Sequence, residues 1–376
     1  MKILQLHNKY RHYGGEDAVV DNEYKLLLNN GFEVEQLFFN NENISPPNLF
    51  FNKESYHITL KKIEEFKPDV IHVHNIFYNA SPSVLKAAKK TNTPVIMTLH
   101  NYRLLCPGAL FLRDSKICTK CKDTTIPYHG IIHKCFQDSY TKSTLLASFI
   151  GLNKIKKTWT NKIDRFIVLT PFIKDLLLNS SLNIIEEKII VKPNSTDDLI
   201  VDKSKKINNK FLFVGRLSKE KGVDTLVKAF NEIPEMELDI IGSGVLETSL
   251  KKIAEKNIKF HGSQNREYIK EKLNTAKALV FPSIWYEGLP NTLIEAFSTG
   301  TPVLSSNLDN INQIVISGYN GETFTPNNAK SLANKVLEFS KKNTVQYGIN
   351  SRQLYEDTYT HQKNLENLTK IYSQLN

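Results

Sequence analysis

The sequence predicts an α/β protein built from two doubly wound domains in tandem, each a parallel sheet with helices on both faces. Three observations predict this fold class. Short β-branched runs alternate with helical patterns along the chain, which is typical of βαβ units. A segment of turn formers and charges, 193–206, interrupts the alternation near the middle. The 376 residues, 40% of them hydrophobic, suffice for two cores.

The first half contains six candidate strands, each a short apolar run bounded by turn formers: 2–6, 33–38, 70–74, 94–99, 163–169 and 188–192. Helical patterns separate them, for example at 18–28 and 82–90. We therefore expect an N-terminal domain over residues 1–195.

The second half repeats the pattern with five more candidate strands: 211–215, 237–241, 258–262, 278–282 and 302–306. We expect a C-terminal domain over residues 205–355. The last segment, 355–376, is predicted as a helix with Leu365, Leu368, Ile371 and Tyr372 on one side. Periodicity alone does not say on which domain it packs. Ligands of open α/β sheets bind at the carboxyl ends of the strands, so we expect the site in a cleft between the domains.

The composition excludes several classes of protein. The share of hydrophobic residues is too high for a disordered chain, and no run approaches the roughly 20 apolar residues that cross a bilayer. Residues 1–17 lack the apolar stretch of a secretory signal, and four cysteines are too few for a disulfide scaffold. We therefore expect a cytoplasmic protein.

The net charge of +10 is concentrated in one stretch. Residues 86–165 hold 15 basic and 4 acidic side chains, whereas the rest of the chain is nearly balanced. A positive field of this kind attracts phosphates, anionic lipid or nucleic acid.

The segment 281–306 contains the most informative motif. A strand ends before a loop with Glu287 and Gly288, and Pro290 suits the first turn of a helix. The free backbone N–H groups of Asn291, Thr292 and Leu293 would then form an anion site. Glu295 would lie more than a turn inside the same helix. A phosphate with hydroxyl-rich groups at both ends, as in a sugar nucleotide, fits these residues. Two ordinary surface glutamates are the alternative.

A second motif follows the strand at 211–215. Arg216 and Lys221 lie at the carboxyl end of that strand, where two cations can neutralise a diphosphate without a metal. Gly242 and Gly244 follow the next strand. A nicotinamide dehydrogenase is disfavoured because this glycine pair lacks a third glycine, Glu247 standing in its place.

These residues resemble the retaining glycosyltransferases of family 4, which have the GT-B fold. The resemblance covers residues 1–325. In the C-terminal half it rests on Arg216, Lys221-Gly222, Gly242-Ser243-Gly244 and the pair Glu287 and Glu295. In the N-terminal half it rests on Gly14-Gly15-Glu16 and on the runs VIHVHN (70–75) and TLHNYR (98–103).

The resemblance implies a role for each matched residue. Arg216 and Lys221 would grip the donor diphosphate, Glu287 the transferred sugar and Glu295 the donor ribose. Gly14 and Gly15 would let the backbone approach the sugar and phosphates. His100 would lie near the reacting centre. It also implies a reaction without a divalent metal, a lipid-linked or other saccharide acceptor, bacterial surface-polysaccharide synthesis, and a C-terminal helix, 356–376, that crosses back onto the N-terminal domain. The donor base, UDP, GDP or ADP, stays open.

Two patterns point to metals. His72 and His74 share a strand face and could form a metal pair, although hydrogen-bonded histidines are the commoner case. Cys118 and Cys121 have metal-ligand spacing, and with Cys106 and Cys135 they could close a structural zinc site; reduced buried thiols or a disulfide are the alternatives.

Residues 144–163 place apolar side chains at helical steps beside four lysines. This pattern fits an interfacial helix on anionic lipid, which would make the protein peripheral on the inner face of the membrane, or a helix packed on its own domain.

Two other functions compete with sugar transfer. An epimerase of the same fold would isomerise a nucleotide sugar without an acceptor. A nucleic-acid-binding protein would use the basic stretch and show salt-sensitive binding. We do not expect a nucleic-acid partner, because it leaves Glu287 and Glu295 without a role.

Overall fold

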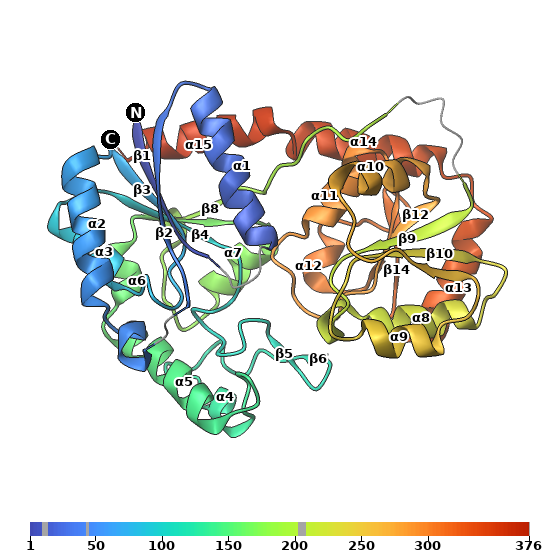
Figure 1. Cartoon of the computed structure of the whole chain (residues 1–376), viewed down its shortest axis with the longest axis horizontal. Coiled ribbons are helices and arrows are strands. Elements are labelled where there is room, and N and C mark those ends of the chain that lie inside the picture. The colour runs from blue at the N-terminus through green and yellow to red at the C-terminus, as the bar shows by residue number, and fades with distance from the viewer. Residues whose placement is uncertain (10–13, 43–44, 202–207, 376) are drawn as a thin grey trace. The chain divides into compact units, whose positions relative to one another are not determined.

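The computed structural model describes residues 1–9, 14–42, 45–201 and 208–375 (Figure 1). The chain forms two compact units. Unit 1 comprises Met1–Phe111, Cys118–Asn194 and Asn364–Asn376, and unit 2 comprises Leu112–Ile117 and Ser195–Lys363. The division after Asn194 falls inside the segment where the sequence pattern breaks. Residue 205, the predicted start of the second domain, lies outside the described residues.

Unit 1 contains a parallel six-stranded sheet with the order β2-β1-β3-β4-β7-β8. Its strands are β1 (Lys2–Asn8), β2 (Glu33–Phe39), β3 (Val70–Asn75), β4 (Val95–Leu99), β7 (Arg165–Val168) and β8 (Ile189–Val191). The six predicted strands are confirmed to within two residues at each end. Both faces of the sheet are covered, so β3 and β4 are buried along their whole length.

The helices of unit 1 connect these strands and cover the sheet. They are α1 (Gly15–Asn29), η1 (Pro46–Leu49), α2 (Lys53–Phe66), α3 (Ser83–Lys90), α4 (Tyr128–Ile132), α5 (Tyr140–Ile155), α6 (Thr158–Lys162), α7 (Pro171–Leu178) and η2 (Glu186–Lys188). The C-terminal helix α15 (His361–Ser373) also belongs here from Asn364 onward. Its Leu368, Ile371 and Tyr372 share a core with Ile3 and Val70. The expected return of this helix to the N-terminal domain is confirmed.

Unit 2 contains a second parallel six-stranded sheet, with the order β11-β10-β9-β12-β13-β14. Its strands are β9 (Lys210–Val214), β10 (Glu237–Ile241), β11 (Ile258–Phe260), β12 (Ala278–Phe281), β13 (Val303–Ser306) and β14 (Gly321–Phe324). Five were predicted. The sequence analysis missed β14, because an edge strand with two polar residues among its four, Glu322 and Thr323, lacks the apolar run that identifies the others.

The helices of unit 2 are η3 (Lys219–Lys221), α8 (Val223–Asn231), α9 (Glu247–Ile253), α10 (Arg266–Thr275), α11 (Asn291–Ser298), α12 (Asp309–Asn312), α13 (Ala329–Ser340) and α14 (Val345–Thr358). A single helix over 355–376 was wrong, since α14 ends at Thr358 and α15 begins at His361. The Thr360 hydroxyl accepts a hydrogen bond from the Lys363 N–H (3.3 Å) and so helps to start the new helix.

A short hairpin, β5 (Leu112–Arg113) and β6 (Lys116–Ile117), interrupts unit 1 in sequence but groups with unit 2. Its turn residues Asp114 and Ser115 both have positive φ, as a tight two-residue hairpin turn requires. The Ser115 carbonyl accepts a hydrogen bond from Asn327 in unit 2 (2.6 Å). In the described part of the chain, no helix is long and apolar enough to span a bilayer.

Candidate active site

The loops after β9 and β12 meet at the carboxyl edge of the unit 2 sheet. Gly222 begins α8 with φ +66°, and a Cβ at this position would lie 2.0 Å from the carbonyl oxygen of Pro282. Only glycine permits both this conformation and this approach. The contact brings Lys221, which precedes Gly222, beside the loop that contains Glu287.

Glu287 is buried, and three donors converge on one of its oxygens. Its Oε1 lies 2.6 Å from Lys221 Nζ, 2.7 Å from Ser283 Oγ and 3.0 Å from Trp285 Nε1. Among the described residues, none forms a hydrogen bond or ion pair with Oε2. The ion pair and the two neutral donors therefore fix the carboxylate in one orientation and leave its second oxygen as an acceptor.

Arg216 lies at the same edge but remains accessible. Its side chain is 71% exposed, and its Nη2 lies 3.2 Å from Glu220 Oε1. The carbonyl of Glu220 accepts hydrogen bonds from the Ser283 hydroxyl and the Ile284 N–H. Arg216, Lys221 and Glu287 are thus connected through one local network, and the exposed guanidinium can reach an anion without breaking a buried contact.

Close backbone contacts explain why glycines follow β10. A Cβ on Gly242 would lie 1.9 Å from the Gly215 carbonyl oxygen, and one on Gly244 would lie 2.4 Å from that of Leu217. The loops after β9 and β10 therefore pack backbone to backbone, which positions the Arg216 segment. Direct contact of Gly242 and Gly244 with a donor stays a prediction.

The start of α11 differs in detail from the prediction. Pro290 is the N-cap rather than the first helical residue, and the Leu293 N–H donates to its carbonyl (3.0 Å). The expectation of a free N–H at Leu293 was therefore wrong, because the first turn closes on itself. Asn291 and Thr292 are partly exposed at this end, whereas Gly288 is buried in the preceding loop.

Glu295 lies in the second turn of α11, apart from the Lys221–Glu287 pair. Burial raises the pKa of its carboxyl to about 7, with Arg266 lowering the pKa and Asp197 raising it further. No hydrogen bond to its side chain is found in the described residues. The structure thus brings together Arg216, Lys221 and Glu287, and it places Glu295 among a different set of charges.

The glycine loop of unit 1 leads into α1. Gly14 is the N-cap with extended backbone angles (φ −137°), which any residue adopts, and Gly15 is exposed. The Gly14 N–H donates to Asp17 Oδ2 (2.9 Å), and Asp17 Oδ1 lies 2.9 Å from His7 Nε2. Conformation therefore does not require glycine at Gly14, and the predicted approach of a ligand stays a prediction.

His100 follows β4 and stacks on His74 of β3. The ring centroids are 5.4 Å apart, and His100 Nε2 lies 3.2 Å from His74 Nδ1. Burial lowers the pKa of His100 to about 3 and that of His74 well below 6.5, with neighbouring histidines and Lys192 adding to the shift. Both imidazoles are therefore neutral at pH 7.

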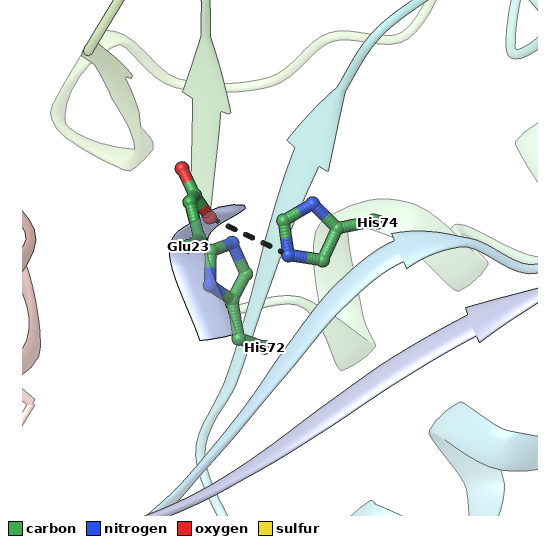
Figure 2. A group of neighbouring side chains, drawn as sticks. All are labelled: Glu23, His72 and His74. Carbon is green, nitrogen blue, oxygen red and sulfur yellow. Dashed lines mark ion pairs between the residues drawn. The ribbon is translucent and has the colours of Figure 1, made fainter. Parts of the chain in front are cut away.

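Glu23, His72 and His74 form a buried cluster (Figure 2). The ligand atoms of these three residues lie within 4.8 Å of one another, which is close enough for a metal ion. However, Lys192 Nζ lies 2.5 Å from Glu23 Oε1, and both nitrogens of His72 are engaged, Nδ1 by Tyr372 and Nε2 by Thr98. The ammonium group supplies the cation that a metal would supply, so this cluster fits the hydrogen-bonded alternative.

The sequence analysis missed Glu23 and Lys192. A signal for Glu23 existed, because Val19, Glu23 and Leu27 recur every four residues and share the buried face of α1. An acid on an apolar helix face needs a buried partner. The partner, Lys192, follows β8 and is fully buried. Lys192 lies 169 residues from Glu23 along the chain, so no local sequence pattern indicates the pair.

The four cysteines are reduced, and Cys106 and Cys121 are buried. The Cys106 sulfur accepts backbone hydrogen bonds from residues just after it, among them Gly108 and Ala109. Burial raises the pKa of Cys121 to about 12, and the other three cysteines contribute to this shift. Among the described residues, the cysteine sulfurs do not form a group within 4.8 Å of one another. Zinc at this position stays a prediction.

The predicted interfacial helix over 144–163 is two helices. The chain turns at Lys157, which has φ +49°, between α5 and α6. Phe149, Trp159 and Ile163 of the expected membrane face are buried in the unit, whereas Leu152 and Ile155 are exposed. One continuous interfacial helix was therefore wrong, because half of its apolar face packs in the core.

Two family descriptions match nearly the whole chain. "Glycosyltransferase Family 4" matches residues 29–198, and "Glycosyl transferases group 1" matches residues 195–375. Together with the two parallel six-stranded sheets, these matches define an α/β protein of GT-B fold. The chain belongs to the glycosyltransferases of family 4.

Relatives and solved structures agree with this assignment. An uncharacterized glycosyltransferase of Methanocaldococcus jannaschii is 25% identical over all of this chain and 99% of its own length. A second one from that organism matches over 61% of its length. The Escherichia coli O-antigen chain mannosyltransferase C is 28% identical over 45% of this chain and 47% of its own. The structure of Anabaena HepE in complex with UDP and glucose superposes with a TM-score of 0.69 over 99% of this chain and 100% of that one, at 17% identity, which shows the shared fold.

Proposed function

We propose that the chain transfers a sugar from a nucleotide-diphosphate donor to a saccharide acceptor in the synthesis of a bacterial surface polysaccharide. The observation that carries this proposal is the network at the edge of the unit 2 sheet. Arg216 offers an exposed cation, Lys221 a second one, and Glu287 a carboxylate whose orientation is fixed. The mannosyltransferase relative and the UDP in the structural neighbour support it.

In this mechanism the charged groups act mainly on the leaving diphosphate. Negative charge develops there as the glycosidic bond breaks, and Arg216 and Lys221 stabilise it. Glu287 Oε2 accepts a hydrogen bond from a hydroxyl of the transferred sugar, because Oε1 already accepts from three donors. We further propose retention of the anomeric configuration and a reaction without a divalent metal, with a donor phosphate oxygen taking the acceptor proton.

The test is a panel of UDP-, GDP- and ADP-sugars in thermal unfolding, followed by turnover with saccharide acceptors. A donor at 100 times its Kd stabilises the folded protein by about 2.7 kcal/mol. Arg216→Ala should abolish the shift and lower turnover on the order of 100–1000-fold. Lys219→Ala, an exposed lysine in the adjacent turn, is the matched control and should keep both.

Four outcomes contradict the proposal. Full turnover by Arg216→Ala would remove the donor-site assignment. Isomerised donor in the absence of an acceptor would indicate an epimerase instead. An inverted anomeric configuration in the product, read from the coupling of its anomeric proton, would contradict retention. Loss of activity on treatment with EDTA would contradict metal independence.

We propose that the acceptor is lipid-linked and that the protein binds an anionic membrane through the exposed faces of α4 and α5. These two helices expose Tyr128, Ile132, Tyr140, Leu152 and Ile155, and lysines flank them. Apolar side chains beside lysines suit the boundary of an anionic bilayer. Leu152→Glu/Ile155→Glu should abolish flotation with phosphatidylglycerol vesicles and keep transfer to a soluble acceptor. Unchanged flotation would contradict the proposal.

We also propose one structural zinc ion bound by Cys106, Cys118, Cys121 and Cys135. Four reduced thiols share a segment rich in turns, and backbone N–H groups already face the Cys106 sulfur. Structural zinc takes four such ligands. Metal analysis of protein purified without chelators should give one zinc per chain, and none after Cys118→Ser/Cys121→Ser. A zinc-free, folded wild-type protein would overturn this.

A further inference from the structure

A chain of buried polar groups lies behind His100. His100 Nε2 lies 3.2 Å from His74 Nδ1, and His74 Nε2 lies 3.6 Å from Glu23 Oε2. The other oxygen of Glu23 is held by Lys192 at 2.5 Å. Figure 2 shows the Glu23 carboxylate directed at the His74 ring. Four segments, α1, β3 and the residues directly after β4 and β8, thus contribute one residue each to this group.

Two atoms in this group of buried side chains face each other, and neither has a hydrogen-bond partner. Glu23 Oε2 and His74 Nε2 are both buried, and neither makes a hydrogen bond. Leaving two such atoms unsatisfied costs free energy, and a closer approach of less than 1 Å satisfies both at once. The carboxylate oxygen can only accept, so this bond requires that His74 carries its proton on Nε2.

The position of this proton determines the tautomer of His100. A neutral imidazole has one N–H, so a proton on His74 Nε2 leaves His74 Nδ1 as an acceptor. His100 must then donate from Nε2, which leaves its Nδ1 with a lone pair. The opposite arrangement would direct the lone pair of His74 Nε2 at a carboxylate oxygen, and these two groups repel each other.

We propose that Glu23 and His74 are positioning residues that hold His100 in the Nε2–H tautomer, so that His100 Nδ1 accepts a hydrogen bond from a hydroxyl of the bound saccharide. This inference rests on the proposed function, since it assigns the hydroxyl to a sugar. No hydrogen bond joins His100 Nδ1 to the described residues. A nitrogen lone pair at this position selects hydroxyl groups over phosphate or carboxylate oxygens, which have no proton to donate.

This role differs from general base catalysis. A base with a pKa of about 3 takes a proton from a sugar hydroxyl poorly at pH 7, because catalysis is best when the pKa lies near the working pH. A fixed hydrogen-bond acceptor requires only the correct tautomer. His74 and Glu23 therefore contribute orientation, as the carboxylate partner of a histidine does in other enzyme sites.

The first test is the tautomer itself. Two-bond ¹H–¹⁵N spectra of the full chain with ¹⁵N-labelled histidine separate Nδ1–H from Nε2–H rings, and the signals missing from His100→Ala identify His100. We expect His100 and His74 as Nε2–H tautomers at pH 7. An Nδ1–H tautomer at His100 in the wild-type protein overturns the proposal, whatever the variants do.

The second test removes the ion pair as a unit. Glu23→Gln/Lys192→Met avoids an unpaired buried charge. We expect an Nδ1–H form of His100 to appear and kcat/KM for the acceptor to fall about tenfold, the worth of one oriented hydrogen bond. Tyr372→Phe, which removes a partner of the neighbouring His72 instead, should change neither quantity.

A double-mutant cycle separates positioning from general support of the fold. In the His100→Ala background, Glu23→Gln/Lys192→Met should cause no further loss of kcat/KM. A further tenfold loss would show a merely structural role and overturn the proposal. The spectra need neither donor nor acceptor. Absence of transfer with every donor would therefore contradict the proposed function and leave the tautomer result intact.

Discussion

The two units each contain a parallel six-stranded sheet but differ in the polar groups at the carboxyl edges of these sheets. In unit 1 the edge residues His74 and His100 are stacked imidazoles that burial keeps neutral. In unit 2 the edge holds the exposed Arg216 and the ion pair of Lys221 with Glu287. One frame therefore supports two kinds of recognition: neutral hydrogen bonding suits hydroxyl groups, and fixed charge suits a diphosphate.

Burial shifts pKa values in both units in the direction of the neutral form. In unit 1 it lowers the pKa of His72 to about 4 and of His100 to about 3, and in unit 2 it raises the pKa of Glu295 to about 7. The signs differ because a base is neutral without its proton and an acid with it. As the pH falls from 7 to 5, the buried histidines should therefore lower the stability of unit 1, and Glu295 should raise that of unit 2.

Removing Lys221 should have the largest effect. Lys221→Ala leaves the buried Glu287 carboxylate without its cation, which should cost about 3–5 kcal/mol of unfolding free energy. Donor turnover should fall on the order of 100–1000-fold. Lys221→Met/Glu287→Gln should recover the stability and stay inactive. Urea unfolding together with donor turnover separates the two effects.

The contrast with Arg216 sharpens this prediction. Arg216→Ala should lose turnover without loss of stability, since its side chain is 71% exposed. Equal destabilisation by both substitutions would show that the charges of unit 2 serve the fold rather than the ligand.

Protonation of His72 and His100 alone should destabilise unit 1 by about 4 kcal/mol between pH 7 and pH 5, and His74, whose pKa burial also lowers, adds to this loss. The folded pKa values of His72 and His100 lie below the value of 6.5 in the unfolded chain. Protons therefore bind the unfolded chain first as the pH falls, at about 2 kcal/mol for each histidine at pH 5. The chain has two tryptophans, and Trp159 reports on unit 1 in a Trp285→Phe variant.

His72→Gln should remove about 2 kcal/mol of this loss, and the exposed His57→Gln should leave it unchanged. A Trp159 transition that does not move between pH 7 and pH 5 would contradict the assignment of neutral buried histidines.

The fold was predictable because it depends on local patterns. Each of the six strands of unit 1 is an apolar run that alternation with helices reveals, and the break at 193–206 separates the two repeats. The failures arose where the local pattern was too weak, as at β14, or was overridden by packing. Residues 144–163 have helical periodicity throughout, but the turn at Lys157 depends on packing of Phe149 and Trp159 that periodicity does not contain.

The candidate site was predictable where its residues follow the ends of strands in short motifs. Arg216, Lys221 and Glu287 come from motifs with fixed spacing, and the structure connects them. The groups behind His100 could not be found in this way. Glu23 of α1 and Lys192, which follows the sheet strand β8, meet only in the folded unit, so no local spacing relates them.

Glu295 should make unit 2 more stable at low pH, which is the opposite of the effect of the buried histidines on unit 1. Its folded pKa of about 7 lies above the unfolded value of 4.5, so its contribution to stability is greatest below pH 4.5 and is lost as the pH rises toward 7. Glu295→Gln mimics the protonated acid and should add about 3 kcal/mol at pH 8 and nothing at pH 4. Trp285 fluorescence in a Trp159→Phe variant measures this in unit 2. An equal gain at both pH values would contradict the raised pKa.

Tyr372→Phe should have the smallest effect and should confine it to unit 1. The Tyr372 hydroxyl lies 2.7 Å from His72 Nδ1, and the substitution removes one buried hydrogen bond, worth about 1 kcal/mol. Because α15 packs with Ile3 and Val70, the loss should appear in the Trp159 transition and leave the Trp285 transition unchanged. A shift of the Trp285 transition alone would mean that the C-terminal helix stabilises the unit 2 sheet. It would contradict the assignment of α15 to unit 1.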